Sequence, residues 1–194
     1  MKDQYFGDIR DLFKFDLAFH IIATCHLVRR FTFIPMLTKR DDGPDGRKRD
    51  YAKAKAGKSN QSLRDHLTKC ADEARPDISG IAGYFTANQL DAIVYSHPEL
   101  SHFEKGCRRE YFGGINREIL QDSLILLDPD NGLENGLEVG RPSERHLLFS
   151  EVQDLYERMG DASILMIYQH FPHEKHEEYL RRRMCQLSNR TGGH

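Results

Sequence analysis

The segment Ser123-Leu-Ile-Leu-Leu-Asp-Pro-Asp-Asn-Gly132 carries the clearest structural signal in the chain. Its first half is a short, continuous apolar run, as in a strand that is buried on both faces, and its second half is rich in turn residues. A second apolar run, Ala162–Tyr168, follows after one helix-length stretch, Ser143–Met159. We therefore expect Leu124–Leu127 and Ile164–Ile167 to be adjacent, parallel, central strands joined by a right-handed crossover.

Hydrophobic periodicity predicts the other elements. Helices are expected over Asp11–Leu27, Ser62–Ala74 with Ser62 as the N-cap, Phe103–Leu120 with Lys105, Arg108 and Arg109 on its outer side, and Lys175–Leu187, and a strand is expected over Phe31–Leu37. Thr38–Lys58 has too few apolar residues to form core and is read as a surface loop. Gly80–Tyr95 fits either a strand or, from Thr86 on, a capped helix, and the sequence leaves both open.

Together these elements predict one domain over residues 1–190. The expected fold class is α/β, a Rossmann-like three-layer sandwich with a mostly parallel central sheet. The last four residues, Thr191 to His194, are interpreted as a flexible tail or the remnant of a purification tag.

Composition excludes several classes of protein. The 30 acidic and 28 basic residues nearly cancel, so a nucleic acid could be held only by a local patch of charge, and no anionic membrane is expected as a partner. The four cysteines are far apart and form no C-x-x-C pair, which argues against a zinc knuckle and a disulfide framework. No signal peptide and no apolar run of about 20 residues are seen. A cytoplasmic location is therefore expected, and the oligomeric state stays open.

Polar residues follow both buried strands where the strands end. Ligands of parallel α/β sheets bind at the carboxyl ends of the strands, so Asp128, Asp130 and His170 are the predicted catalytic residues of one crevice. The alternative is that the segment after the strand is only a turn. Two carboxylates one residue apart can hold Mg²⁺, or one can orient an amino group while the other stays solvated. His170 is a candidate acid, base or hydrogen-bond donor.

Two other patterns are weaker. The segment Asp41–Arg49 offers glycines and three consecutive cations, the ingredients of a phosphate-binding loop, but a solvated loop has the same composition. His170, His173 and His176 are spaced by three and could form a zinc triad, although the last two are expected to face water.

Several words of the sequence resemble a family of uncharacterised bacterial and phage proteins. The matching words are Tyr5-Phe-Gly-Asp8, Lys14-Phe-Asp16, Met36-Leu-Thr38, Leu127-Asp-Pro-Asp-Asn-Gly-Leu-Glu134 and Ile167-Tyr-Gln-His-Phe-Pro172. They span most of the chain, and the last two are the most specific. This resemblance implies no function.

The layout also resembles, more distantly, the Rossmann methyltransferases that include three-Cys-motif partner proteins and the enzyme that methylates adenine in 23S ribosomal RNA. In those enzymes a D-x-x-K-H helix precedes the first strand and an Asp-Pro-Pro-Tyr segment ends the fourth; here Asp11-Leu-Phe-Lys14 and Asp128-Pro-Asp-Asn131 have similar places. The chain departs from them at Met36-Leu-Thr38, where their glycine loop binds S-adenosylmethionine, and it lacks the tyrosine that stacks on the target base.

Three functional hypotheses follow. The first is a methyltransferase-like Rossmann enzyme that acts on a nucleotide or nucleic acid, with S-adenosylmethionine as the implied cofactor. The second is a divalent-metal-dependent nuclease or phosphodiesterase, in which Asp128 and Asp130, with Asp8 or Glu134, hold Mg²⁺. The third is a non-catalytic nucleotide-binding module. The predicted ligand-binding residues are Asp8, Asp11, Lys14, Thr38, Asn131, Gly132 and Gln169.

Overall fold

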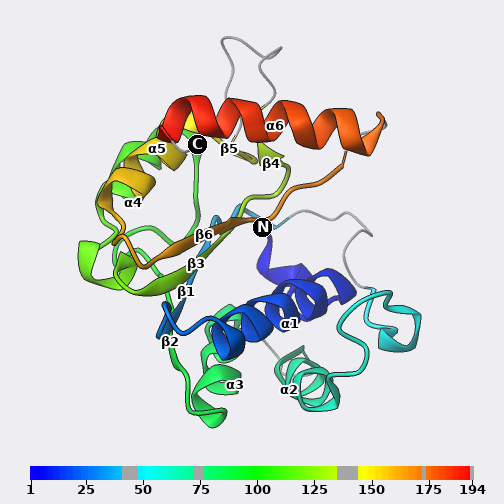
Figure 1. Cartoon of the computed structure of the whole chain (residues 1–194). Helices are drawn as coiled ribbons and strands as arrows, with labels where there is room; N and C mark the ends of the chain where they lie inside the picture. The colour runs from blue at the N-terminus through cyan, green and yellow to red at the C-terminus, as the bar shows by residue number, and fades with distance from the viewer. Residues whose placement is uncertain (41–47, 72–76, 135–143, 172–173, 193–194) are drawn as a thin grey trace.

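The computed structural model describes residues 1–40, 48–71, 77–134, 144–171 and 174–192 (Figure 1). Its centre is a four-stranded sheet of order β2-β1-β3-β6 in which every pair of neighbours is parallel. The strands are β1 (Arg30–Pro35), β2 (Asp91–Val94), β3 (Ser123–Asp128) and β6 (Ile164–Ile167). A separate parallel pair consists of β4 (Gly132–Leu133) and β5 (His146–Leu147). The predicted Rossmann-like α/β class is confirmed.

The pairing of β3 with β6 confirms the central expectation from the sequence. Leu124 pairs with Ile164 and Leu127 with Ile167, in parallel register. The expectation that both strands are central is wrong for β6, which lies at the edge of the sheet and is only half-buried. A short apolar run does not reveal how many neighbours a strand has, whereas β3 is buried along its whole length.

Helices cover both faces of the sheet (Figure 1). One face carries α1 (Ile9–Thr24), α2 (Gln61–Ala71) and α3 (Ile81–Ala87), and the other carries α4 (Arg108–Gly113), α5 (Phe149–Arg158) and α6 (His176–Thr191). Alternate residues of β3 supply the two cores, because side chains of a strand point to opposite faces. Leu124 and Leu126 pack with the first set of helices, and Ile125 and Leu127 pack with the second.

Several element boundaries differ from the sequence expectations. Helix α1 begins at Ile9, two residues early, because the carboxylate of Asp8 accepts hydrogen bonds from the amides of Arg10 and Asp11 at 2.7 and 3.0 Å and caps the helix. The predicted Ser62 cap of α2 is wrong. Asn60 has that role, since its side-chain oxygen accepts from the amide of Leu63 at 3.0 Å.

Two longer segments resolve into shorter pieces. Neither alternative for Gly80–Tyr95 is correct as placed: the part where a strand could begin is helix α3, and the part after Thr86 where a capped helix was offered contains strand β2. The single helix expected over Phe103–Leu120 is wrong, because glycines end α4 and 3-10 turns flank it. The 3-10 turns within the described ranges are η1 (Asp3–Tyr5), η2 (Tyr51–Lys53), η3 (Ile78–Gly80), η4 (Lys105–Cys107) and η5 (Arg117–Leu120). Arg108 does not face outward, since its guanidinium lies 2.6 Å from the carboxylate of Glu151.

The remaining differences concern loops and ends. Thr38–Lys58 is not wholly a surface loop, because Tyr51 of η2 is buried, and residues 41–47 lie outside the described ranges. The crossover helix starts at Phe149 instead of Ser143, after β5. Thr191 belongs to α6 and is not part of a tail; residues 193–194 lie outside the described ranges.

The described residues contain no helix that is long and apolar enough to cross a membrane. All four cysteines are free thiols, as the sequence predicted.

Candidate functional site

A pocket of about 220 Å³ lies at the carboxyl edge of the sheet, against the start of α1. In this strand order the chain leaves β1 toward β2 on one side and runs from β3 to β6 on the other, so the topological switch point lies between β1 and β3. The pocket is beside that point. Its lining residues are Met1, Lys2, Tyr5, Asp8, Arg10, Asp11, Lys14, Asp128, Pro129, Asp130, Asn131, Arg145, Tyr168 and His170.

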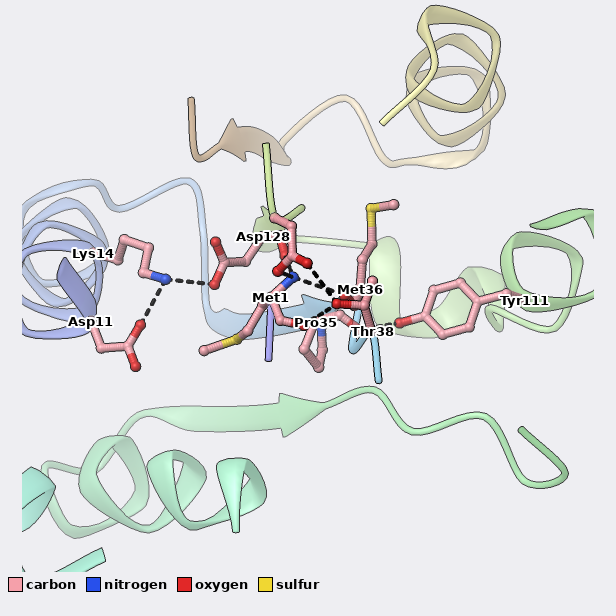
Figure 2. A network of polar contacts seen from close by, with 9 residues as sticks. Met1, Asp11, Lys14, Pro35, Met36, Thr38, Tyr111 and Asp128 are labelled. Atoms are coloured by element: carbon pink, nitrogen blue, oxygen red, sulfur yellow. Dashed lines mark hydrogen bonds and ion pairs between the residues drawn. The ribbon is translucent and has the colours of Figure 1, made fainter. Parts of the chain in front are cut away.

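In the pocket, Lys14 forms ion pairs with both Asp11 and Asp128 (Figure 2). Its ammonium lies 2.7 Å from Oδ1 of Asp11 and 2.5 Å from Oδ2 of Asp128, and all three side chains are almost fully buried. Burial alone acts to lower the pKa of Lys14, but the two carboxylates outweigh it and raise that pKa above its ordinary value. Lys14 is therefore a permanent cation that holds Asp128 in place.

Asp11 and Asp8 belong to the turn that enters α1. The second oxygen of Asp11 accepts a hydrogen bond from the amide of Gly7 at 2.8 Å. Burial raises the pKa of Asp11 to about 6, although Lys14 acts in the opposite direction. Burial also raises the pKa of Asp8, whose carboxylate caps the helix. Both predicted ligand-binding carboxylates thus line the pocket while serving the local fold.

Asp130 lies beside the amino terminus of Met1, whose pKa burial lowers although Asp130 and Asp128 act to raise it. Its Oδ1 is 2.7 Å from the ammonium of Met1, and its Oδ2 accepts a hydrogen bond from the hydroxyl of Thr38 at 2.6 Å. Burial acts to raise the pKa of Asp130, but the Met1 ammonium and these hydrogen bonds lower it overall. Thr38 itself does not line the pocket and acts through Asp130. Both carboxylate oxygens of Asp130 therefore already have a partner within the protein.

His170 and Tyr168 form the wall that follows β6. Their rings meet edge to face with centroids 5.0 Å apart, and the Lys14 ammonium lies 4.8 Å from the Tyr168 ring centroid. Burial, followed by the charge of Arg10, lowers the pKa of His170, so the imidazole is neutral at pH 7. Burial raises the pKa of Tyr168. The structure thus brings His170 into the same pocket as Asp128 and Asp130.

The other predicted ligand-binding residues have mixed positions. Asn131 lines the pocket, whereas Gly132 and Gln169 do not. The side-chain oxygen of Gln169 accepts from the amide of Leu133 at 2.7 Å, and its nitrogen donates to the carbonyl of His170 at 2.9 Å. Gln169 therefore fixes the segment after β6 against the segment after β3.

Sequence reasoning missed four lining residues that matter to the chemistry: Tyr168, Arg10, Arg145 and Lys2. Tyr168 had a usable signal, because it is the first residue beyond the strand Ile164–Ile167 and precedes His170 by two positions. The cations had none, since charged residues at such positions are common on any surface.

The carboxylates do not form a metal-binding group in this arrangement. Across the described ranges, no three His, Cys, Asp or Glu side chains are grouped so that they could hold a metal ion. Lys14 instead lies between Asp11 and Asp128. Of the predicted histidine triad, His173 lies outside the described ranges. His176 is exposed and stacks on Phe171 with ring centroids 4.3 Å apart, away from the pocket that His170 lines.

S-adenosylmethionine does not fit the position where the resemblance would place it. The chain continues from Pro35 into Met36 and Leu37 without a glycine turn. The Met1 ammonium donates to the carbonyls of Met36 at 2.9 Å and Asp128 at 3.2 Å, so Met1 fills the crevice between the ends of β1 and β3 (Figure 2).

Comparison of the chain with protein-family models, with curated proteins and with solved structures gave no significant match.

Proposed function

We propose that this pocket binds a nucleotide, free or within a nucleic acid, and presents an amino group of its base to Asp128. The carrying observation is that Lys14 fixes the Asp128 carboxylate in a pocket that Tyr168 and His170 also line. A carboxylate accepts hydrogen bonds from an exocyclic amino group, and an aromatic ring offers a surface for a base. Arg10 and Arg145 on the same lining supply cations for phosphate.

Methyl transfer to that amino group is the reaction that the sequence resemblance implies. The Rossmann-like sheet and the position of Asp128 at the end of β3 support this proposal. The end of β1 does not offer a glycine cradle for S-adenosylmethionine. The role that this chain's residues supply is orientation: Asp128 accepts from the amino group, and neutral His170 can donate or accept beside it.

The metal-dependent alternative has less support. The carboxylates of Asp11 and Asp128 already share one cation, the Lys14 ammonium, at hydrogen-bonding distance. A divalent ion would have to displace Lys14 or bind beside it, and both bring two cations close together in a buried place.

Calorimetric titration with cytidine, adenosine and uridine monophosphates tests the proposal, because uracil lacks an exocyclic amino group. A hydrogen bond to a charged acceptor contributes about 1.5–3 kcal/mol, so the cytidine or adenosine compound should bind at least about tenfold more tightly than the uridine compound. S-adenosylmethionine and Mg²⁺ are titrated separately. Equal binding of all three nucleotides, or binding of none, would overturn the proposal.

A variant pair makes the test specific to the pocket. Tyr168→Leu should weaken nucleotide binding by about 5- to 150-fold, since base–aromatic stacking is worth about 1–3 kcal/mol. Tyr156→Leu, at a tyrosine of α5 that is 42% exposed and does not line the pocket, should leave binding unchanged. Similar losses in both variants would show that the nucleotide binds elsewhere.

A further inference from the structure

A second pocket, hereafter the basic pocket, adjoins the candidate site. It has a volume of about 480 Å³ and lies between the end of β1 and turn η4. Its cationic lining residues are Lys2, Lys39, Arg40, Lys105 and Arg145, and its acidic lining residues are Glu104 and Glu144. Among the described residues, these five cations exceed the two lining carboxylates by three charges, and the pairing of Arg40 with Asp3 at 2.9 Å reduces the excess to two, in a chain whose formal net charge is −2. The positive field is therefore local to this part of the surface.

The two pockets share two cationic residues. Lys2 and Arg145 line both the candidate site and the basic pocket. Thr38 links them as well, because it lines the basic pocket while its hydroxyl donates to Asp130 in the candidate site. The cationic lining of the candidate site thus continues into the lining of the basic pocket.

Two lysines of the basic pocket are accessible to an anion. Lys39 pairs with Glu104 at 2.7 Å, but the two side chains are 72% and 55% exposed. Lys105 is also exposed. An exposed ion pair contributes little, about 0–1 kcal/mol, so a phosphate can replace Glu104 at small cost.

We infer that the natural ligand is a single strand of nucleic acid, one nucleotide of which enters the candidate site while neighbouring phosphates lie in the basic pocket. This inference rests on the proposed function. A free monophosphate would leave the excess charge of the basic pocket unused, whereas a strand carries a phosphate at every nucleotide. Single-stranded nucleic acid is favoured over a duplex. In a duplex, the amino group that would donate to Asp128 is used in base pairing.

Fluorescence anisotropy with a labelled cytidine- and adenosine-rich hexanucleotide, measured at several salt concentrations, tests this inference. The wild-type chain should bind the hexanucleotide at least about tenfold more tightly than the monophosphate at low salt. Lys39→Gln/Lys105→Gln should lower the slope of log K against log salt by about 0.7 for each phosphate that the variant no longer neutralises, and should leave monophosphate binding unchanged.

The matched control is Lys53→Gln/Lys58→Gln. Lys53 pairs with Asp50 at 2.8 Å and is 83% exposed, much as Lys39 pairs with Glu104, and neither Lys53 nor Lys58 lines either pocket. This control should bind the hexanucleotide as the wild type does.

The outcomes separate the two proposals. Monophosphate binding without any gain for the hexanucleotide overturns the strand inference and leaves the proposed function standing. The strand inference is also overturned if Lys39→Gln/Lys105→Gln and Lys53→Gln/Lys58→Gln lose hexanucleotide binding equally. The loss would then reflect the net charge of the protein and not the basic pocket. A nucleoside triphosphate that matches the hexanucleotide in affinity and in sensitivity to Lys39→Gln/Lys105→Gln assigns the basic pocket to a polyphosphate and overturns the strand. Absence of monophosphate binding contradicts the proposed function itself.

Discussion

The ammonium of Lys14 lies 2.5 Å from Oδ2 of Asp128, and 114 positions of the chain separate the two residues. The contact joins α1 to the carboxyl end of β3, and both side chains are almost fully buried. A buried ion pair stabilises a protein only while both partners are present, because the charge that remains after one is removed is uncompensated. The candidate site and this polar contact of α1 with the sheet therefore depend on the same residues.

Lys14→Met should destabilise the protein by about 3–5 kcal/mol, since Asp11 and Asp128 would lose their common cation. Urea unfolding followed by circular dichroism measures this change. The control is Lys175→Met. Lys175 pairs with Glu178 at the surface, where the two side chains are 82% and 65% exposed. The control should change the unfolding free energy by less than about 0.5 kcal/mol. Equal effects of the two substitutions would contradict the role given to Lys14.

The pH dependence of stability should carry the signature of Asp11. Its pKa is raised to about 6 in the folded chain, from about 4 in an unfolded one, so the folded state binds the proton more tightly. The contribution of Asp11 to the unfolding free energy is therefore largest below pH 4 and decreases as the pH rises to 6. The wild-type value minus that of Asp11→Asn should fall over this window, by at most about 1.4 kcal/mol per pH unit. A difference that rises with pH would rule out the raised pKa.

Gly132→Ala should cost about 1–3 kcal/mol of stability. Gly132 has a φ of +85°, and a Cβ there would lie 2.5 Å from Cδ of Gln169, whose amide bonds the segment to Leu133 and His170. Nucleotide binding should weaken as well, because His170 moves with Gln169. Gly113→Ala is the control: a Cβ at this helical position meets nothing within 4 Å, so the variant should be as stable as the wild type or slightly more so. Thermal unfolding compares the two variants. If Gly132→Ala is as stable as the wild type, a Cβ at this position causes no strain.

Asp128 and Asp130 should respond differently to substitution. Asp130 is satisfied by the Met1 ammonium and Thr38, so Asp130→Asn should keep most nucleotide binding. Asp128→Ala removes the proposed acceptor and should reduce binding by about tenfold or more. Calorimetry with and without Mg²⁺ measures both. Strict metal dependence of binding that is lost in both variants would favour the metal-dependent hydrolase over our proposal.

The sequence predicts those parts of the fold that depend on local pattern. Leu124–Leu127 and Ile164–Ile167 were assignable because both are short apolar runs with turn residues after them, and parallel pairing followed from the connection between them. The strand Asp91–Val94 was not assignable, because only four residues carry it and Thr86 suggested a helix cap. Boundaries also depended on caps such as Asn60, which is visible only once its side chain is placed.

The candidate site was predictable in part for the same reason. Asp128 and His170 stand at strand ends, and parallel strands bring those ends to one edge. The pairing of Lys14 with Asp128 has no local signature, because the spacing along the chain says nothing about which side chain of a helix meets a strand end. Likewise, the inward position of Arg108 is set by Glu151 of another element, which no periodicity within Phe103–Leu120 reveals.

The distance along the chain between Lys14 and Asp128 also sets the order in which the pocket can form. During synthesis α1 leaves the ribosome long before β3, and until β3 is made Lys14 has only Asp11 as a charged partner from this triad. An amino-terminal fragment that ends before β3 therefore has neither the pocket nor the contact between α1 and β3, although Phe15 of α1 can already pack on Phe31 and Phe33 of β1. Because Arg145, Tyr168 and His170 also line the pocket, ligand binding during translation should appear only after β6 has been made.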